Sequence, residues 1–494
     1  MALQRRRINQ EQEQRVEMLF EKLKDYGGSE IYPYHMPGHK RQGMGGLPPQ
    51  LAELDITEID GFDNLHRPEG ILRELQQYAA DAYGAEEAYY LVGGSTSGIL
   101  SAVSAAIPRG GRLLISRNCH KSIYHAAYLR QLQLSYLYPE QVPEVDICEA
   151  VSPEQVREAL EHEQDINGVL IVSPTYEGRI AEVEEIAQIV HAHGIPLIVD
   201  EAHGAHLGFH SAFACGSSRA GADLVVTSVH KTLPAMTQTA LLQVNGSLVD
   251  RGLVRRFLRI YQSSSPSYVL MASIDNAIRL VREEGRKLFG QMADNWHGML
   301  ERLSACRALT VWPPVSLPQE EYQKHQDIGK LIISVKNTEI TGQELYRELL
   351  ERYGLQLEMV CDDYVLAMFT VGDVSRGYQR MAEALLEIDS RLKRLGGEET
   401  QWPKETTPQR RVGLPLCESW DLPVQWTVLE DAVGRYSGTF VNIYPPGTPI
   451  LVPGECLEEA DVRRIERYLA DGLNVQGISV RNGVPGLEML TLAK

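Results

Sequence analysis

Between residues 70 and 250 the chain alternates short apolar runs with segments of helical periodicity. Strand-length apolar runs separated by helices are typical of a parallel sheet that is covered by helices on both faces. The sequence therefore predicts an α/β domain, in which ligands bind beyond the carboxyl ends of the strands. We expect strands at 88–92, 112–116, 169–173, 196–200, 224–228 and 240–244, and helices at 97–107, 151–161 and 181–193.

The length of 494 residues predicts more than one domain, because single hydrophobic cores stop growing at about 250–300 residues. Apolar residues at helical spacing predict an N-terminal helix at 10–25. Strands at 331–335 and 365–370 and a helix near 377–394 predict a smaller α+β unit. We expect five segments: an N-terminal arm and helix (1–45), a large domain (46–310), a small α+β domain (311–395), a linker (396–411) and a C-terminal α+β module (412–494).

Composition argues against several classes of protein. The chain has no run of about 18 apolar residues that would predict a membrane-spanning helix, and its polar start does not resemble a secretory signal. Seven scattered cysteines without a C-x-x-C pair argue against a disulfide framework or a zinc site, so we expect no metal and a reducing cytoplasm. The net charge of −18 disfavours nucleic acid and anionic membranes as partners, and mildly favours a cationic small molecule.

A segment rich in glycine and hydroxyl groups, GGSTSG at 93–98, follows the first expected strand and opens a helix. Ser95, Thr96 and Ser97 would offer hydroxyls beside free backbone N–H groups, which together form an anion cradle at a helix N-terminus. Helix capping without a ligand is the alternative interpretation, because serine and threonine are preferred capping residues.

Three further side chains follow expected strand ends. Asp200 closes an apolar strand, where a buried carboxylate needs a cationic partner. Lys231 follows the strand at 224–228, although a lysine in that position commonly points to solvent. His120 follows the strand at 112–116 and could lie flat on a planar ring, with helix capping or a place in the core as the alternatives.

Together these residues match the requirements of one cofactor, pyridoxal 5′-phosphate (PLP). PLP requires a lysine for its aldehyde, a carboxylate that keeps its pyridine nitrogen protonated, and donors for its phosphate. Lys231, Asp200 and the cradle at 93–98 supply these three groups. Asp200 precedes Lys231 by 31 residues, which leaves room for one helix and one strand between them.

Eight segments, in order and over most of the chain, closely resemble the bacterial ornithine/lysine/arginine decarboxylases, PLP enzymes of the aspartate-aminotransferase fold. The segments are HMPGHK (35–40), DNLHRPEG (63–70), RNCHKS (117–122), SPTYEGR (173–179), DEAHGAH (200–206), SVHKT (228–232), SSSPSY (263–268) and YPPGTPILVPGE (444–455). The resemblance implies a large α/β domain with a mainly parallel seven-stranded sheet, a small α+β domain and a C-terminal α+β module. It also implies an enzyme that decarboxylates a basic amino acid with PLP as its cofactor.

The resemblance also implies roles for individual residues. Lys231 would bind the PLP aldehyde, Asp200 would contact the pyridine nitrogen, and His120 would stack on the ring. The residues expected to hold the cofactor and its phosphate are Ser95, Thr96, Ser97, His203, Ser228 and His230. Ser264 and Ser265 would reach the phosphate of the neighbouring subunit, in a homodimer or a dimer-based higher oligomer with shared active sites. We assign Glu455, Thr175 and His35 to the substrate, and either Lys231 or His230 to protonation of Cα.

Only 34 residues precede HMPGHK, so we expect the chain to lack the N-terminal wing domain of the longer, decamer-forming members. It is similar instead to the short members that are often called arginine decarboxylases, which implies conversion of arginine to agmatine in polyamine biosynthesis. Lysine (to cadaverine) and ornithine (to putrescine) are alternative substrates. An aminotransferase of the same fold and an inactive regulator are more remote alternatives.

Glu455 lies in an expected loop ahead of a helix at 457–470. As a substrate-binding residue it would contact the distal cation of a basic amino acid, and its replacement by glutamine would leave the melting temperature nearly unchanged. The alternative is an acidic residue that interacts favourably with the N-terminus of the following helix.

Overall fold

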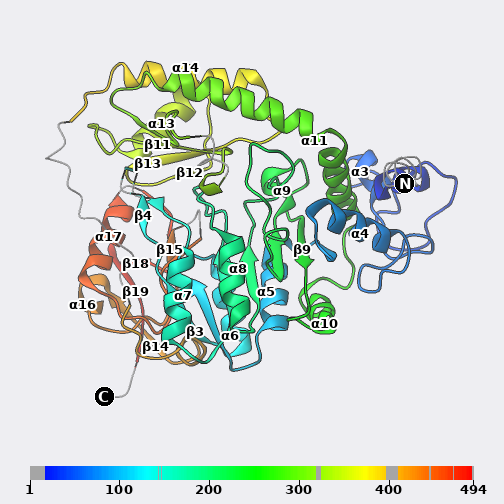
Figure 1. Ribbon diagram of the computed structural model, residues 1–494, viewed down its shortest axis with the longest axis horizontal. Helices are drawn as coiled ribbons and strands as arrows, with labels where there is room; N and C mark the ends of the chain where they lie inside the picture. Colours follow the sequence, from blue (N-terminus) through cyan, green and yellow to red (C-terminus); the bar gives the residue numbers. More distant parts are fainter. Residues whose placement is uncertain are drawn as a thin grey trace.

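The large domain of the computed structural model is built on a seven-stranded sheet with the order β1-β9-β8-β7-β6-β2-β3 (Figure 1). The structure describes residues 17–142, 144–145, 147–318, 324–395, 410–443, 447–470 and 472–491. Within this sheet β9 is antiparallel to β1 and β8, and the other neighbours pair in parallel. The strands are β1 (Glu87–Leu91), β2 (Arg112–Ser116), β3 (Gln133–Leu137), β6 (Ile166–Val172), β7 (Leu197–Asp200), β8 (Leu224–Thr227) and β9 (Ala240–Val244).

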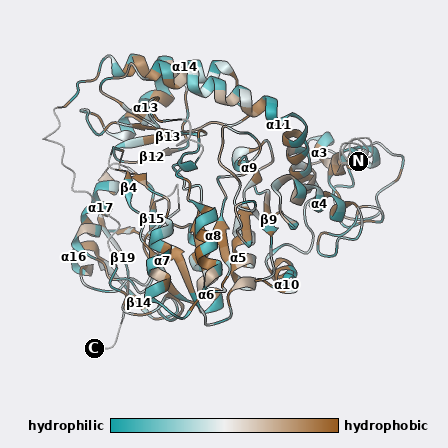
Figure 2. Cartoon of the chain, viewed as in Figure 1, coloured by the Kyte–Doolittle hydropathy of each residue, from teal (hydrophilic) through white to brown (hydrophobic). Residues whose placement is uncertain are grey.

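Apolar side chains of this sheet alternate between two helical layers. Leu170 and Val226 pack toward α5, α6 and α10, whereas their neighbours Val169 and Val225 pack toward α7 and α8. Because both faces are buried, the strands are continuous apolar runs, which Figure 2 shows as brown arrows between the helices. The helices of this domain are α4 (Ile71–Tyr83), α5 (Gly94–Ala106), α6 (Lys121–Arg130), α7 (Pro153–His162), α8 (Val183–Ala192), α9 (Val229–Thr232) and α10 (Arg251–Tyr261).

A 36-residue helix, α11 (Tyr268–Leu303), leads from the large domain to a small α+β domain. The small domain has an antiparallel sheet with the order β10-β11-β13-β12, and α14 packs on the second half of α11 above it (Figure 1). Near the start of α11, Asp275 accepts a hydrogen bond from the backbone of Leu19 at the N-terminus of α2. The elements are α2 (Leu19–Gly27), α3 (Pro49–Leu54), β10 (Thr310–Trp312), β11 (Lys330–Ser334), α13 (Gly342–Tyr353), β12 (Met359–Val360), β13 (Tyr364–Met368) and α14 (Ser375–Asp389).

The C-terminal module contains two three-stranded sheets, β14-β19-β18 and β16-β15-β17, and a separate apolar cluster that includes α17. In Figure 1 it lies against the β2 and β3 side of the large domain, at the opposite end from α4. A two-stranded ribbon of β4 (Gln141–Val142) and β5 (Ile147–Cys148) lies nearby. The module comprises α15 (Leu416–Ser419), β14 (Val424–Val428), α16 (Leu429–Ala432), β15 (Val441–Ile443), β16 (Pro449–Leu451), α17 (Glu459–Ala470), β17 (Val475–Gln476), β18 (Ser479–Arg481) and β19 (Val484–Leu490).

The α/β fold class and the seven-stranded, mainly parallel sheet are confirmed. The six strands and three helices expected in the large domain are present, with ends shifted by up to three residues. The strand β3 was not predicted, because QLSYL mixes polar and apolar residues. The described part of the expected N-terminal helix is α2, which begins at Leu19 and ends at Gly27. Residues 1–16 of the expected arm and helix, and 396–409 of the expected linker, lie outside the described residues. Among the helices that the structure describes, none is long and apolar enough to span a membrane.

The contact between α5 and the sheet predicts a strict size limit at Gly98. A Cβ added there would lie 2.6 Å from Leu91 Cδ1 and 2.8 Å from Val226 Cγ1. We expect Gly98→Ala to lower the free energy of unfolding by about 1–3 kcal/mol, the usual cost of overpacking, as measured by denaturant unfolding. Gly298→Ala in α11, where no atom lies within 4 Å, is the control and should be neutral or stabilising. Equal stability losses in both variants would contradict this packing.

Candidate active site

Five loops that carry the expected site residues emerge at one edge of the large sheet, because β1, β2, β6, β7 and β8 end there. At the centre, Lys231 Nζ lies 2.9 Å from His203 Nε2. Lys231 belongs to α9, the single helical turn that follows β8, and His203 belongs to the turn after β7. The lysine is half-buried and its amine contacts His203, so the alternative of a solvent-facing lysine does not apply here.

Asp200 is the last residue of β7 and is 5% exposed. Its carboxylate accepts a hydrogen bond of 3.2 Å from the backbone N–H of Ala202. Burial raises the pKa of Asp200, and the charge of Lys231 opposes that shift. The buried acid that the sequence predicted therefore has the cationic neighbour it needs.

His120 caps α6, and its Nδ1 accepts a hydrogen bond from the backbone N–H of Ser122. The helix-capping interpretation of His120 is thus correct. Burial, together with the charges of Lys231 and Lys121, lowers the pKa of His120 to about 4. The ring is therefore neutral near pH 7, with Nδ1 as the acceptor and the proton on Nε2.

The segment 93–98 forms the first turn of α5, but none of its hydroxyls caps the helix. Ser97 Oγ instead donates to the Gly94 carbonyl at 2.9 Å, and no hydrogen bond joins the hydroxyls of Ser95 or Thr96 to another described residue. The capping interpretation of these residues is wrong. Apart from the Gly94 N–H, which donates to the Gln238 carbonyl, the N–H groups in the first turn of α5 and these two hydroxyls remain available to an anion.

Ser228 lies beside this helix end. Its hydroxyl is fully buried, with no hydrogen-bond partner among the described residues. Residues 238–239 connect the start of α5 with the start of α9, which follows Ser228. The Gln238 carbonyl accepts from the Gly94 N–H at 2.9 Å, and the Thr239 carbonyl accepts from the Val229 N–H at 3.1 Å. His230 Nδ1 donates to the same Thr239 carbonyl at 2.8 Å, which leaves Nε2 as an acceptor. An unpaired buried hydroxyl next to free helix N–H groups fits an anionic ligand.

Three residues of the site were not predicted. Lys330 of the small domain places Nζ 2.7 Å from His203 Nδ1. The Tyr176 ring lies 4.5 Å from the His203 ring, and its hydroxyl donates to Glu358 at 2.5 Å. Tyr176 stands within a segment that carried the family resemblance, but Lys330 and Glu358 have no such signal because only tertiary contacts bring them to the sheet edge.

Glu455 lies between β16 and α17, in the expected loop, but it is a buried and paired acid. It is 1% exposed, and Oε2 pairs with Arg117 Nη2 at 2.9 Å and with the backbone N–H of Val452. The helix α17 begins four residues later at Glu459, so the helix N-terminus interpretation is wrong. The expectation that Glu455→Gln leaves the melting temperature unchanged is contradicted by this buried ion pair.

The remaining predicted residues lie at three different places. Thr175 is buried after β6, where Oγ1 accepts from the Arg179 N–H at 3.1 Å. His35 contacts Tyr26 and the Met36 carbonyl in the N-terminal segment, between α2 and α3 in the sequence. Ser264 and Ser265 are exposed in the loop between α10 and α11. None of these four residues has a described hydrogen bond to Lys231, Asp200 or His120.

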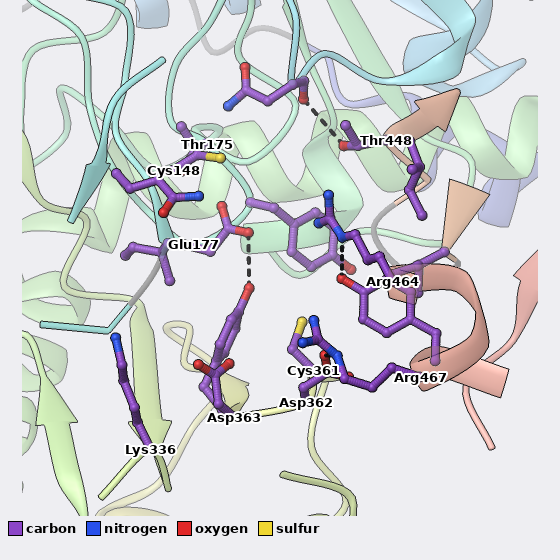
Figure 3. Close-up of a pocket in the computed structure, with 18 of the residues that line it drawn as sticks. Cys148, Thr175, Glu177, Lys336, Cys361, Asp362, Asp363, Thr448, Arg464 and Arg467 are labelled. Carbon is purple, nitrogen blue, oxygen red and sulfur yellow. Dashed lines mark hydrogen bonds and ion pairs between the residues drawn. The ribbon is translucent and has the colours of Figure 1, made fainter. Parts of the chain in front are cut away.

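A cavity of about 470 Å³ lies where the three domains meet, next to Thr175 and Tyr176 (Figure 3). Glu177 from the large domain faces Asp362 and Asp363 of the small domain across it, and Arg464 and Arg467 enter from α17. Tyr364 donates to Glu177 at 3.4 Å, and Arg467 pairs with Asp362. The cavity therefore carries both acidic and basic groups.

Residues 18–338 match the model of the family described as Orn/Lys/Arg decarboxylase, major domain. The chain belongs to this family. It is 31% identical to an arginine decarboxylase of Bacillus subtilis (93% of this chain, 95% of the relative). It is also 32% identical to an arginine decarboxylase of Halalkalibacterium halodurans (90% and 91%), and 24% identical to the constitutive lysine decarboxylase of Escherichia coli (82% and 68%). Family membership makes the protein a PLP-dependent amino-acid decarboxylase.

Solved structures confirm the fold. The constitutive lysine decarboxylase of E. coli superposes with a TM-score of 0.80 at 19% identity (99% of this chain, 84% of the other). Lysine decarboxylase A from Pseudomonas aeruginosa gives 0.81 at 20% identity (96% and 80%).

The ion pair between Arg117 and Glu455 predicts a large loss of stability in Glu455→Gln. Removal of one partner from a buried pair costs about 3–5 kcal/mol, because the other charge stays buried without compensation. We expect a clearly lower melting temperature by calorimetry. The control is Glu459→Gln, which removes an exposed pair with Arg463 and should change stability by less than about 1 kcal/mol. Identical melting temperatures for the two variants would contradict a structural role of the buried pair.

Proposed function

We propose that the protein binds PLP at the edge of the large sheet and decarboxylates L-arginine to agmatine. The observation that carries this proposal is the meeting of Lys231, buried Asp200 and neutral His120 at one sheet edge, in a chain of the decarboxylase family. The same observation argues against an inactive regulator, because the lysine and the acid are both in place. Family membership argues against an aminotransferase.

The described residues fit PLP. Lys231 offers the amine that reacts with the PLP aldehyde. The charge of Asp200 acts on Lys231, so the two side chains lie near each other, and Asp200 offers the carboxylate for the pyridine nitrogen. Ser228 offers the buried hydroxyl that lacks a partner, next to the N–H groups of α5 and the hydroxyls of Ser95 and Thr96. Ser97, His203 and His230 border the same space.

When bound, PLP supplies an electron sink for the electron pair that remains at Cα after carbon dioxide leaves. Asp200 holds a proton on the pyridine nitrogen and so stabilises that charge. His120 presents a neutral ring toward the cofactor. In neutral His230 the proton resides on Nδ1, which donates to the Thr239 carbonyl, and burial lowers the pKa of its ring. This supports Lys231, rather than His230, as the donor of the proton to Cα.

The choice of arginine rests on the relatives, because those at 31–32% identity are named arginine decarboxylases and the E. coli lysine decarboxylase is at 24%. The cavity beside Thr175 would receive the side chain of the substrate, with Glu177 as a carboxylate on its wall. Glu455 can contribute to binding of the distal cation only through Oε1, which is buried and has no described hydrogen-bond partner. We assign the reaction to polyamine biosynthesis in the cytoplasm.

A homodimer is proposed as the active form. Ile31, Tyr32, Tyr34, Met36 and Met44 expose apolar surface within a short N-terminal stretch, and Tyr34 is 90% exposed. Such a patch is typical of a surface that another chain covers. His35 lies in the same stretch, and the exposed positions of Ser264 and Ser265 are compatible with contacts to a second subunit.

Carbon dioxide release with arginine, lysine and ornithine tests the proposed substrate. We expect the highest kcat/KM for arginine, with agmatine as the product. A higher value for lysine or ornithine would overturn the substrate while leaving the decarboxylase function in place. Release of an oxo acid without carbon dioxide would overturn the proposed reaction.

Asp200→Asn tests the electrostatic role of the buried acid. An amide cannot hold the proton on the pyridine nitrogen, so kcat should fall by about 100-fold or more, corresponding to at least ~2.7 kcal/mol of transition-state stabilisation. Single-turnover measurement of carbon dioxide release, with PLP content determined in parallel, separates this loss from weaker cofactor binding. An unchanged kcat at full PLP content would refute the role of Asp200.

A further inference from the structure

Glu177 is a partly exposed acid that lines the cavity of about 470 Å³ between the three domains, and its side chain points into that cavity (Figure 3). Burial raises its pKa, because a carboxylate is costly to ionise away from bulk water. The hydroxyls of Thr175 and Tyr364 donate to it, but no lysine or arginine of the described chain forms an ion pair with it. A cationic ligand in the cavity would supply that partner.

A tight turn after β6 fixes the position of Glu177. The Gly178 N–H donates to the Thr175 carbonyl at 3.0 Å, and the Thr175 N–H donates to the Arg179 carbonyl at 2.8 Å. A Cβ added to Gly178 would lie 2.7 Å from Lys330 Cγ, so the turn also packs closely against the small domain. The segment that presents Glu177 to the cavity is therefore held in place, as a residue that selects a substrate requires.

Tyr176 connects this cavity with the catalytic lysine. Its side chain lines the cavity, and the centre of its ring lies 6.0 Å from Lys231 Nζ and 4.5 Å from the ring of His203. A substrate whose amino group takes the place of the Lys231 amine can therefore extend its side chain past Tyr176. An extended arginine side chain spans about 6 Å from Cα to the guanidinium carbon. Its distal cation would then reach Glu177, the next residue of the turn.

Two other carboxylates that could receive the cation already have a cationic partner. Asp362, on the small-domain wall of the cavity, pairs with Arg467 of α17. Glu455 pairs with Arg117 at 2.9 Å. A substrate cation would have to share either carboxylate with an arginine, so it would gain less from them than from Glu177.

We propose that Glu177 binds the distal cation of the substrate and thereby selects a basic side chain over a neutral one of the same length. Its carboxylate would accept charge-assisted hydrogen bonds from a guanidinium or ammonium group. A neutral side chain would leave the carboxylate without that partner, which is the physical basis of the selection. The inference rests on the proposed function, and it gives Glu177 the contact that the sequence suggested for Glu455.

Lys330 is the nearby protein cation with which a substrate would compete. Its charge acts on Glu177, but the two side chains form no ion pair. Lys330 is 0% exposed, its Nζ lies 2.7 Å from His203 Nδ1, and it is not among the residues that line the cavity. Lys330 therefore favours the ionised form of Glu177 without occupying the face of the carboxylate that the cavity exposes.

The test compares L-arginine with L-citrulline, in which an uncharged urea group of similar size replaces the guanidinium. Carbon dioxide release by the PLP-loaded full chain gives kcat/KM for both compounds. In wild type we expect a preference for arginine of at least about 100-fold. Glu177→Gln should lower kcat/KM for arginine by about ten-fold or more, mainly through KM, and leave the value for citrulline unchanged. The preference should shrink by the same factor.

Glu163→Gln is the matched control. Glu163 is also a half-buried acid that accepts a hydrogen bond from a hydroxyl group, that of Ser135, but it does not line the cavity. This variant should keep the wild-type preference. An unchanged preference in Glu177→Gln, or equal losses with arginine and citrulline, would overturn the inference.

The same comparison separates this inference from the proposed function. If wild type prefers lysine, then lysine and the neutral norleucine replace the first pair, and the expectation for Glu177→Gln stays the same. If wild type releases carbon dioxide from no basic amino acid, the proposed function fails.

A measurement on the unmodified protein covers the case in which Glu177→Gln does not fold. A crystal structure of the PLP-loaded full chain with agmatine locates the guanidinium directly. We expect its nitrogens within hydrogen-bonding distance of the Glu177 carboxylate. A guanidinium bound to Asp363 on the opposite wall, to Glu455, or outside the cavity would overturn the inference.

Discussion

Charged groups buried at the carboxyl edge of the large sheet need partners, and this requirement links the three domains. Lys231 and Lys330 share His203 and so connect the large domain to the small domain. Arg117 pairs with Glu455 and connects the large domain to the C-terminal module. Because each pair joins residues that are distant in the sequence, the site forms only when the domains are docked.

The large domain was predictable because its strands are buried on both faces. A strand with two buried faces is a short apolar run, as at β6 and β8, and glycine-rich or helical segments delimit it. The antiparallel direction of β9 was not predictable, because an apolar run has no direction of its own. The edge strand β3 was not predicted, because its polar and apolar residues alternate and so do not form a continuous apolar run.

The site was predictable where a residue conflicted with its local surroundings. A carboxylate at the end of an apolar strand marked Asp200, and a lysine just past the next strand marked Lys231. Lys330 gave no such signal, because a lysine ahead of an apolar strand commonly lies in solvent and only tertiary contacts bury it. The partner of Glu455 lies 338 residues away in the sequence, so the local pattern suggested an exposed acid.

The central claim is that Lys231, and not the neighbouring buried Lys330, carries the cofactor. Incubation of the protein with PLP, reduction with borohydride and peptide mapping by mass spectrometry tests this most directly. The account predicts one phosphopyridoxyl group per chain, on the peptide that contains Lys231, and none in Lys231→Ala. Modification of Lys330 in place of Lys231, or retention of the group in Lys231→Ala, would contradict it.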